Sequence, residues 1–497
     1  MQVKTAAFKA SARRTLADPV LQGALENVYT GFHLKRIQAA AATDQWQPQR
    51  DRARRVKAHT VANLDHYLDM LTRNVEAKGG HVRFAADGQE AARYVVELAK
   101  ARGVGTVIKS KSMVSEEIGL NHVLEQASIE PIETDLGEYI IKLARETPYH
   151  IIAPAIHKTQ DQVADLLSAH TGGQRGRTAQ ELTATARVLL RDAFQRADMG
   201  VTGVNFAVAE TGSIVLVTNE GNGRMCTSAP RIHVALMGME KVVPSMADLA
   251  MFLRILIRSA TGQRISTYVS VINGPRGADD EDGPDEFHLV IVDNNRHRLL
   301  ADAALREALY CIRCGACMNA CPVYRKVGGH SYGWVYPGPI GAVVSPVMSG
   351  LEAGKALPFA SSLCGACREV CPVGIDIPSM LLHLRSVVVE GGPGGEAPRP
   401  ASAGAAGGRC EPARPPVGRS VADRLAFAAW RFGMAGRRKF DLGARLAWLV
   451  GLPVARGGWA GWLPPPLRGW TASRRFRMPA RRSFVARWRA ARRGRAV

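Results

Sequence analysis

The chain has 497 residues, 46% of them hydrophobic, which is enough for roughly two or three folded domains. Its formal net charge of +21 is uneven, because residues 411–497 contain 20 Lys and Arg but only three Asp and Glu. We expect a cytoplasmic protein, because the sequence shows neither an apolar signal segment nor a run of about eighteen apolar residues that would span a membrane.

Residues 1–78 are expected to form a helical arm. Apolar residues such as Val61, Leu64 and Leu68 recur three or four positions apart, as on one face of a helix. An Arg- and Ser-containing start is also a feature of transit peptides, but Glu26 and the mixed charges that follow favour a native arm.

Residues 79–295 are expected to form one α/β domain. Short strand-like runs alternate with helical patterns, an order typical of a parallel sheet that is covered on both faces. The expected strands are 81–85, 105–108, 150–154, 201–209, 213–218, 232–237, 268–272 and 287–292. The expected helices are 88–101, 112–125, 136–145 and 178–197.

Several polar residues of this domain follow expected strands, where open α/β sheets bind ligands. Lys109 and Lys111 are candidates for binding an anion at the start of the next helix, or they belong to an exposed turn. Glu220, Asn222 and Arg224 are candidates for orienting a carboxylate or phosphate.

Other reactive side chains of the chain are given weaker roles. Glu210 is a weak candidate for an acyl-transfer nucleophile, although a Glu-Thr-Gly turn is more often only a turn. His157 and His233 are interpreted as structural histidines. Cys226 and Cys410 have no cysteine at metal-ligand spacing and are interpreted as ordinary thiols.

Seven of the nine cysteines lie in two repeated runs, 311–322 and 361–372. The first run is C-x2-C-x2-C-x3-C-P, and the second has the same frame with Ser361 where the first cysteine would stand. This spacing is an iron–sulfur signature, in which three cysteines ligate one cluster and the fourth ligates its neighbour. Zinc sites use four ligands in two pairs, and disulfides need an oxidising compartment, so neither fits the pattern.

Applied to these runs, the rule predicts two clusters. The ligands of cluster 1 are Cys311, Cys314, Cys317 and Cys371, and those of cluster 2 are Cys321, Cys364 and Cys367. Cluster 2 thus lacks one thiolate. Its fourth iron is held by Ser361, by water or by a partner's group, or is absent, and the sequence does not choose among these. If either cluster meets a substrate or partner directly, this unusual one is favoured.

The cysteines are expected to lie on helices in residues 296–390. Residues 298–310 and 378–389 have helical patterns, whereas the Gly- and Pro-rich segment 328–346 between the motifs is expected to be irregular. Residues 391–419 are expected to be a Gly/Pro/Ala-rich linker.

The C-terminal region, 420–497, contains six of the eight tryptophans and most of the excess arginine. Residues 425–430 and 442–450 are expected to form short amphipathic helices. Such a surface is suited to docking on a partner protein or at the inner face of a membrane, with no specific ligand as a further alternative; nucleic acid is not expected.

Seven long strings of this sequence resemble the lactate utilization protein B family, in the same order along residues 20–390. They are KSKSM (109–113), ETDLGEYI (133–140), PAIHK (154–158), GVTGVNFAVAETG (200–212), NEGNGR (219–224), ATGQ (260–263) and GGHSYGWVYPGPIGAV (328–343), and they accompany both cysteine runs. In the tail the resemblance is weaker.

The resemblance implies a lactate-utilization (LUD) domain similar to ribose-phosphate isomerase and CoA-transferase-like α/β proteins. It also implies an α-helical ferredoxin domain with two [4Fe-4S] clusters, the second held by three cysteines. Family members act with a cysteine-rich-domain subunit and a second LUD protein to oxidise L-lactate to pyruvate.

We therefore expect an electron-transfer subunit that is not catalytic alone, because no flavin or nicotinamide fingerprint follows a strand. Two alternatives stay open. In one, the chain oxidises a hydroxy acid itself through Glu210, Lys109 or the open iron of cluster 2. In the other, the chain is a redox-sensing scaffold.

Overall fold

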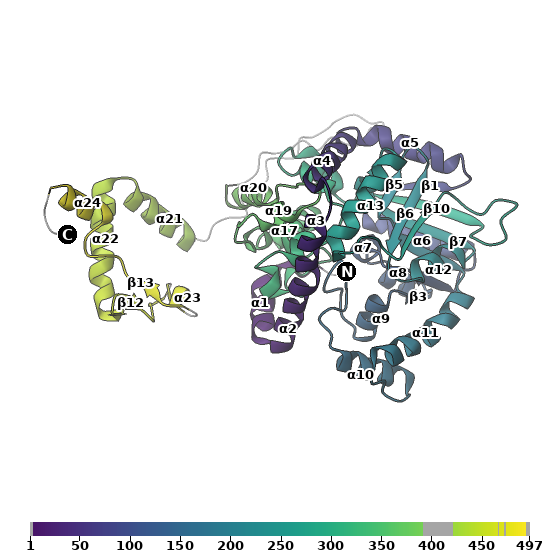
Figure 1. Ribbon diagram of the computed structural model, residues 1–497, viewed down its shortest axis with the longest axis horizontal. Helices are drawn as coiled ribbons and strands as arrows, with labels where there is room; N and C mark the ends of the chain where they lie inside the picture. The colour runs from purple at the N-terminus through teal and green to yellow at the C-terminus, as the bar shows by residue number, and fades with distance from the viewer. Residues whose placement is uncertain (1–2, 391–420, 466, 472–473, 494–497) are drawn as a thin grey trace. The chain divides into compact units, whose positions relative to one another are not determined.

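The computed structural model describes residues 3–390, 421–465, 467–471 and 474–493, in two units, Met1–Val417 and Gly418–Val497 (Figure 1). The first unit contains the six-stranded and four-stranded sheets and all seven motif cysteines. The expected linker and Cys410 lie outside the described residues.

The expected N-terminal arm is helical. Its helices are α1 (Phe8–Ala17), α2 (Pro19–Val28), α3 (Lys35–Ala41), α4 (Trp46–Ala62) and α5 (Leu64–Glu76). Asp18 begins α2, because its side chain accepts hydrogen bonds from the backbone N–H groups of Val20 and Leu21 and Pro19 occupies the first turn. The arm also reaches the cysteine region, where Arg325 donates to Glu26 at 2.8 Å.

A six-stranded parallel sheet is the centre of the α/β part. Its order is β1 (His81–Ala85), β10 (Glu286–Val292), β7 (Ile232–Gly238), β4 (Met199–Gly203), β2 (Thr106–Lys109) and β3 (Glu130–Glu133). The prediction of a parallel sheet is confirmed, although β3 was not expected because Pro131 disfavours a strand.

Both faces of this sheet are buried, and β7 shows how. Val234 and Leu236 pack on one face with apolar residues of helices α6 (Gly88–Ala101) and α8 (Leu120–Gln126). Ala235 and Met237 alternate with them and pack on the other face, against α5 and a second sheet. Because both faces of this strand are buried, its sequence is a continuous run of mostly apolar residues.

The second sheet has four strands, β8 (Val242–Val243), β5 (Phe206–Val208), β6 (Ser213–Thr218) and β9 (Tyr268–Ile272), and it is mixed. The sequence predicted one strand over 201–209. The structure divides that run between the two sheets, with Gly203, Val204 and Asn205 as the connection. The Asn205 side chain fixes the bend by accepting from the N–H of Val217 at 2.9 Å.

The strand predicted for 150–154 is wrong. This segment has no regular structure, because it packs on the cysteine region instead of on a sheet. His150 Nε2 lies 2.8 Å from Oδ1 of Asn319, next to the first cysteine motif, and His150 Nδ1 accepts from the N–H of Ile152 at 3.1 Å.

Three of the four helices expected in the α/β part are present as α6, α9 (Leu136–Leu143) and α11 (Ala179–Arg196). The fourth, 112–125, is two helices, α7 (Met113–Glu117) and α8. They are separated at Gly119, whose φ of +67° a helix interior does not allow. Another long helix, α13 (Met246–Thr261), packs on the second sheet.

The cysteine region is helical in short pieces. The pattern over 298–310 is divided between α14 (Arg296–Ala301) and a 3-10 turn, Arg306–Tyr310, whereas 378–389 forms α20 (Ile377–Glu390) as expected. The segment 328–346 was expected to be irregular, but its second half begins the buried helix α17 (Gly338–Ser349). Pro339 is tolerated there because it lies in the first turn, where no helical N–H bond is lost.

The second unit contains α21 (Val421–Met434), α22 (Arg437–Gly451), α24 (Phe484–Arg492) and three two-residue strands. Both short helices predicted for the tail are therefore present, within α21 and α22. No helix in the described ranges is long and apolar enough to cross a membrane.

Candidate iron–sulfur site and adjoining cavity

The two cysteine motifs fold in the same way. In the first, Arg313 and Gly315 have φ angles of +59° and +74°, and in the second, Leu363 and Gly365 have φ angles of +55° and +84°. Each pair precedes a short helix, α15 (Ala316–Asn319) or α19 (Ala366–Val370), and the two helices are in contact. The sequence repeat is thus a structural repeat.

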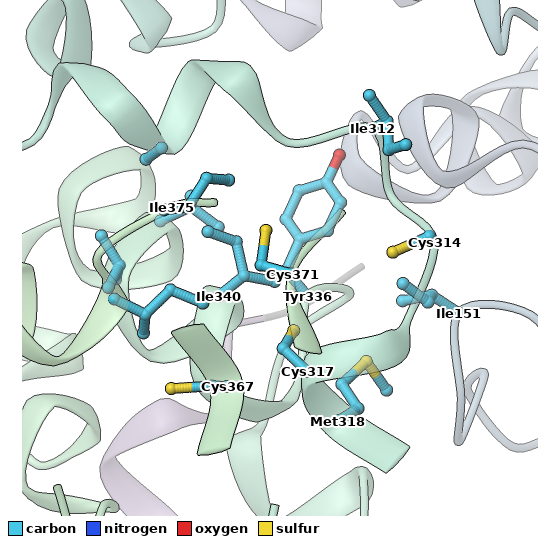
Figure 2. Close-up of a cluster of buried hydrophobic side chains, with 14 of the residues drawn as sticks. Ile151, Ile312, Cys314, Cys317, Met318, Tyr336, Ile340, Cys367, Cys371 and Ile375 are labelled. Atoms are coloured by element: carbon cyan, nitrogen blue, oxygen red, sulfur yellow. The ribbon is translucent and has the colours of Figure 1, made fainter. Parts of the chain in front are cut away.

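Four cysteines line one small enclosed cavity: Cys311, Cys314, Cys317 and Cys371. Figure 2 shows the sulfurs of Cys314, Cys317 and Cys371 turned toward a common space. Burial, followed by the neighbouring sulfurs of Cys371 and Cys311, raises the pKa of the Cys314 thiol. The fold thus gathers the set predicted for cluster 1, including Cys371 from the other motif.

The remaining three cysteines form a second group. Burial, and then Cys321, raises the pKa of the Cys367 thiol to about 12, with Cys364 contributing further. In Figure 2 the Cys367 sulfur points away from the first group. Cys321 and Cys367 are buried and Cys364 is exposed, so this second group reaches the surface of the unit at Cys364.

Ser361 has in the second motif the position that Cys311 has in the first. The N–H of Leu363 donates to its Oγ at 3.1 Å, and the equivalent N–H of Arg313 donates to the Cys311 Sγ at 3.4 Å. The serine hydroxyl therefore takes the place of the first cysteine sulfur in the repeat.

The residues present fit iron–sulfur clusters. All eight cysteines of the described residues are free, and six of them are buried. Burial raises the pKa of most of these thiols and so disfavours the thiolate form. Iron removes this cost when it binds the thiolates. Ile340 and Ile375 cover the first group and would keep water from a cluster.

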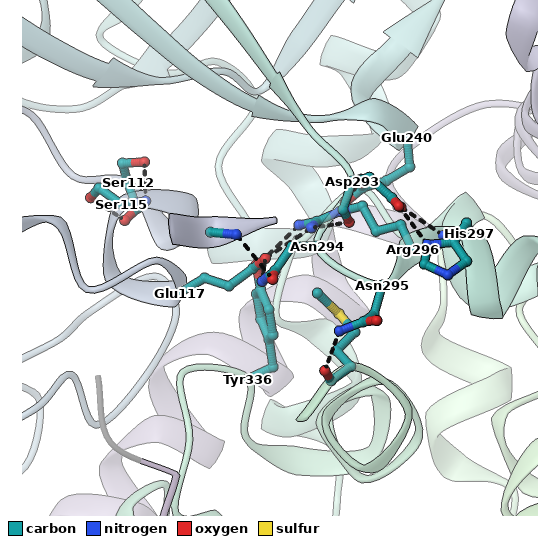
Figure 3. Close-up of polar contacts among 12 residues, drawn as sticks. Ser112, Ser115, Glu117, Glu240, Asp293, Asn294, Asn295, Arg296, His297 and Tyr336 are labelled. Carbon is teal, nitrogen blue, oxygen red and sulfur yellow. Dashed lines mark hydrogen bonds and ion pairs between the residues drawn. The ribbon is translucent and has the colours of Figure 1, made fainter. Parts of the chain in front are cut away.

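A buried ion network joins the first motif to the α/β part, and Figure 3 shows its members Glu117, Arg296 and Tyr336. The Arg296 guanidinium, 1% exposed, donates two hydrogen bonds to Glu117 at 2.9 Å and one to Glu240 at 2.7 Å. Glu240 also accepts from Arg313 at 3.3 Å, and Tyr336 donates to Glu117. Because Arg313 lies between two cluster ligands, this network fixes the loop that presents them.

The carboxylate of Glu240 is strongly held in its charged form. Burial alone would raise the pKa of Glu240, but Arg296 and Arg313 outweigh burial and lower it far below its usual value. A β-carbon at Gly238 would collide with the side chains of Glu240 and Arg296, so this position requires glycine.

A cavity of about 610 Å³ lies at the carboxyl ends of four strands of the parallel sheet. It is lined by Lys111 after β2, Asp135 after β3, Asn205 after β4 and Lys241 after β7. Residues of the cysteine region also line it, namely Arg313, Cys314 and Tyr336. The cavity therefore connects the usual ligand edge of an open α/β sheet with the first cysteine group.

The structure separates the two candidate lysines. Lys109 is fully buried and donates to Glu133 and to Asn121, each at 2.6 Å, so its charge is already paired. Burial alone would lower the pKa of Lys109, but Glu133 raises it above its ordinary value. Lys111 lines the cavity, and its Nζ donates to the carbonyl of Ile152.

Glu220 and Asn222 also line the cavity, whereas Arg224 stacks over the ring of Tyr268 at 5.6 Å. Burial, and then Asp135, raises the pKa of Glu220. Glu210 lies at the surface, where its carboxylate accepts from the N–H of Met246 at 3.0 Å and so caps α13.

The two histidines interpreted as structural are both hydrogen-bonded. His233 Nε2 lies 2.8 Å from Thr202 Oγ1, and His157 Nε2 lies 2.6 Å from Glu146. The thiol of Cys226 is buried 3.4 Å from the hydroxyl of Thr134, away from both cysteine groups.

Lys241 and Arg313 line the cavity but were not predicted from the sequence. Lys241 lies three residues after the apolar run of β7, so its place after a buried strand was an available signal. Arg313 had no such signal in the sequence, because a residue between two motif cysteines is expected in a cluster-binding loop and not in a cavity wall.

Comparison with known proteins agrees with this geometry. Residues 68–292 match the LUD domain, and residues 307–375 match the 4Fe-4S dicluster domain. Lactate utilization protein B of Bacillus velezensis is 40% identical over 97% of both chains, and that of Bacillus thuringiensis is 41% identical over 97% of both. An uncharacterized electron transport protein of Escherichia coli, YkgF, is 47% identical over 79% of this chain and 83% of its own. The chain belongs to the lactate utilization protein B family.

Proposed function

We propose that this chain is the iron–sulfur electron-transfer subunit of a complex that oxidises L-lactate to pyruvate. The observation that supports it most is the placement of the two cysteine groups. The first is buried beside the large cavity, and the second reaches the surface at Cys364. A chain with one electron-transfer group inside and one at its surface can pass electrons between a reaction site and a partner.

In this proposal Cys311, Cys314, Cys317 and Cys371 hold cluster 1, and Cys321, Cys364 and Cys367 hold cluster 2, with Ser361 in the fourth position. Bound [4Fe-4S] clusters supply one-electron carriers. Oxidation of lactate to pyruvate releases two electrons and two protons. Two carriers in one chain match the electron count, while the protons go to groups outside the clusters.

The proposed partners are a cysteine-rich-domain subunit and a second LUD protein, and the proposed location is the cytoplasm, with the basic tail available for contact with the membrane surface. The exposed Leu425, Trp430 and Phe432 of α21, together with the tail's excess arginine, support a docking role.

A growth assay tests the proposal. A strain that lacks this gene should regain growth on L-lactate when it carries the wild-type chain or Cys226→Ala, whose thiol lies outside both groups. Cys314→Ala should fail to restore growth, although the protein is present at wild-type level. Restoration by Cys314→Ala would refute an electron-transfer role for cluster 1.

A further inference from the structure

The ligand of the large cavity is suggested by two cations on its wall. Lys241 ends the 3-10 turn Met239–Lys241 that follows β7 and is only 9% exposed, yet its Nζ makes no hydrogen bond or ion pair with any residue of the described part of the chain. Its remaining exposed surface belongs to the cavity lining. The charge of Glu240 acts on this ammonium without a hydrogen bond to it, and a buried ammonium that lacks a hydrogen-bond acceptor is costly, so this position calls for an anion that reaches the Nζ.

Arg313 supplies the second cation. Its Nη2 donates to Glu240 at 3.3 Å, and its guanidinium lies over the ring of Tyr336 at 4.3 Å, so the group is held in one orientation. Its Nη1 is buried and has no hydrogen-bond partner among the described residues. Arg313 also lines the cavity, so it places a positive charge of fixed position at the cavity wall.

The local charges do not balance without an additional anion. Glu240 is shared by Arg296, Arg313 and Lys241, while the other carboxylate of the network, Glu117, is bound by Arg296 and Tyr336. Two carboxylates thus face three cations at this edge of the sheet, and two of these cations, Arg313 and Lys241, line the cavity.

Lys57 shows the contrast. It is buried beside Glu240, but it does not line the cavity, and its Nζ donates to the backbone carbonyls of Glu240 at 2.5 Å and Val242 at 3.4 Å. If the cations served only to offset the negative charge of cluster 1, Lys241 would have no reason to face the cavity. Its position fits an organic ligand with a negative end.

We propose that Lys241 and Arg313 bind the carboxylate of a small organic acid, of the 2-hydroxy or 2-oxo class, in the cavity beside Cys314. The class of acid rests on the proposed function, whereas the need for an anion rests on the two cations. Polar side chains of Ser112, Asn205 and Asn222 on the same cavity can hydrogen-bond the hydroxyl or carbonyl group. This assigns the substrate-class site to this chain, on the side of cluster 1.

Equilibrium dialysis of the full-length, iron-loaded chain without partners tests the site. Anaerobic dialysis with labelled L-lactate and labelled pyruvate should show saturable binding. Lys241→Gln should weaken it roughly tenfold or more, because a charge-assisted hydrogen bond is lost. Lys241→Arg should retain most of the affinity, and Lys57→Gln, which alters the same ion network away from the cavity, should leave it near the wild-type value.

A spectroscopic measurement needs no variant. Pyruvate should change the electron paramagnetic resonance spectrum of the dithionite-reduced wild-type chain, because the ligand lies beside Cys314. Absence of saturable binding to a wild-type preparation with full iron content would overturn the inference, as would equal loss of affinity in Lys57→Gln and Lys241→Gln.

The site inference and the proposed function can fail independently of each other. If lactate reduces the clusters of the assembled complex while the isolated chain binds neither acid, the site inference is wrong and the electron-transfer function stands. If the isolated chain binds both acids through Lys241 while lactate leaves the clusters of an active complex oxidised, the site stands and the electron-transfer function is wrong.

Discussion

Ser361 occupies in the second cysteine motif the place that Cys311 occupies in the first. The N–H two residues further along the chain donates to the serine Oγ at 3.1 Å and to the cysteine Sγ at 3.4 Å. The two loops share their left-handed residues, so the substitution changes the ligand atom and not the backbone. The proposed cluster 2 therefore differs from cluster 1 at one defined position.

Ser361→Cys should give cluster 2 a fourth thiolate. The added negative charge should lower the midpoint potential of this cluster by roughly 60 mV or more, which is a tenfold change in the equilibrium constant for one electron. A redox titration followed by electron paramagnetic resonance measures it. Ser362→Cys adds an exposed thiol to the same loop and is the control. Identical potentials in Ser361→Cys and wild type would show that residue 361 does not face the cluster.

Arg296→Met should destabilise the first unit strongly. The change leaves Glu117 and Glu240 buried without their main partner, which typically costs about 3–5 kcal/mol. Chemical unfolding of the iron-loaded chain measures the loss. Arg102→Met is the matched control, because its ion pair with Glu286 is exposed to solvent, and it should unfold almost as the wild type does.

If Arg296→Met and Arg102→Met had equal effects on unfolding, the buried network would not fix the first motif. We also expect Arg296→Met to lower the iron content, because Glu240 would lose the partner that positions it against Arg313.

Buried His233 should make stability fall with acidification. Burial, and then His288, lowers the pKa of His233 from 6.5 to about 3. Below about pH 6.5 the unfolded chain takes up a proton that the folded chain does not accept until about pH 3. This group's stabilisation is therefore complete above pH 6.5 and is lost progressively as the pH falls toward 3.

Replacing this histidine tests the effect. His233→Gln should remove up to about 1.4 kcal/mol per pH unit from the slope of stability against pH in that range. Thermal unfolding at a series of pH values measures the slope. His122→Gln, at an exposed position, should keep the wild-type slope. An unchanged slope in His233→Gln would show that the imidazole is protonated in the folded state.

The basic tail should contribute to docking. Removing residues 421–497 should leave the iron content intact, because all seven motif cysteines belong to the first unit, and it should weaken association with the partner subunits. Association of the full chain should fall as salt rises. Co-sedimentation of the full chain and the truncated chain with anionic vesicles measures membrane binding, for comparison with binding to the partner subunits. Loss of vesicle binding with unchanged partner binding would assign the tail to the membrane instead.

The sequence predicted the parts whose signal is local. The spacing of the cysteines within each loop predicted two groups of sulfurs. The contribution of Cys371 to the first group followed from the rule that the fourth cysteine of a motif ligates the neighbouring cluster. The buried strands were recognisable for the same reason, since each is a short apolar run between turns.

Contacts between distant segments were not predictable from local patterns. Residues 150–154 read as a strand because Ile151 and Ile152 are apolar and β-branched, but these side chains pack on the cysteine region. The cavity was missed because Lys241 and Arg313 meet only when the sheet edge and the first motif come together. Lys109 appeared available because Glu133, its partner, belongs to a strand that the sequence did not reveal.

An anaerobic titration of the assembled complex with L-lactate tests the central claim most directly. Visible absorbance and electron paramagnetic resonance follow the clusters while pyruvate is measured in parallel. We predict that lactate bleaches the cluster absorbance and yields reduced-cluster signals, and that a complex built with Cys314→Ala forms little pyruvate. Continued turnover with clusters that remain oxidised throughout would contradict the electron-transfer role.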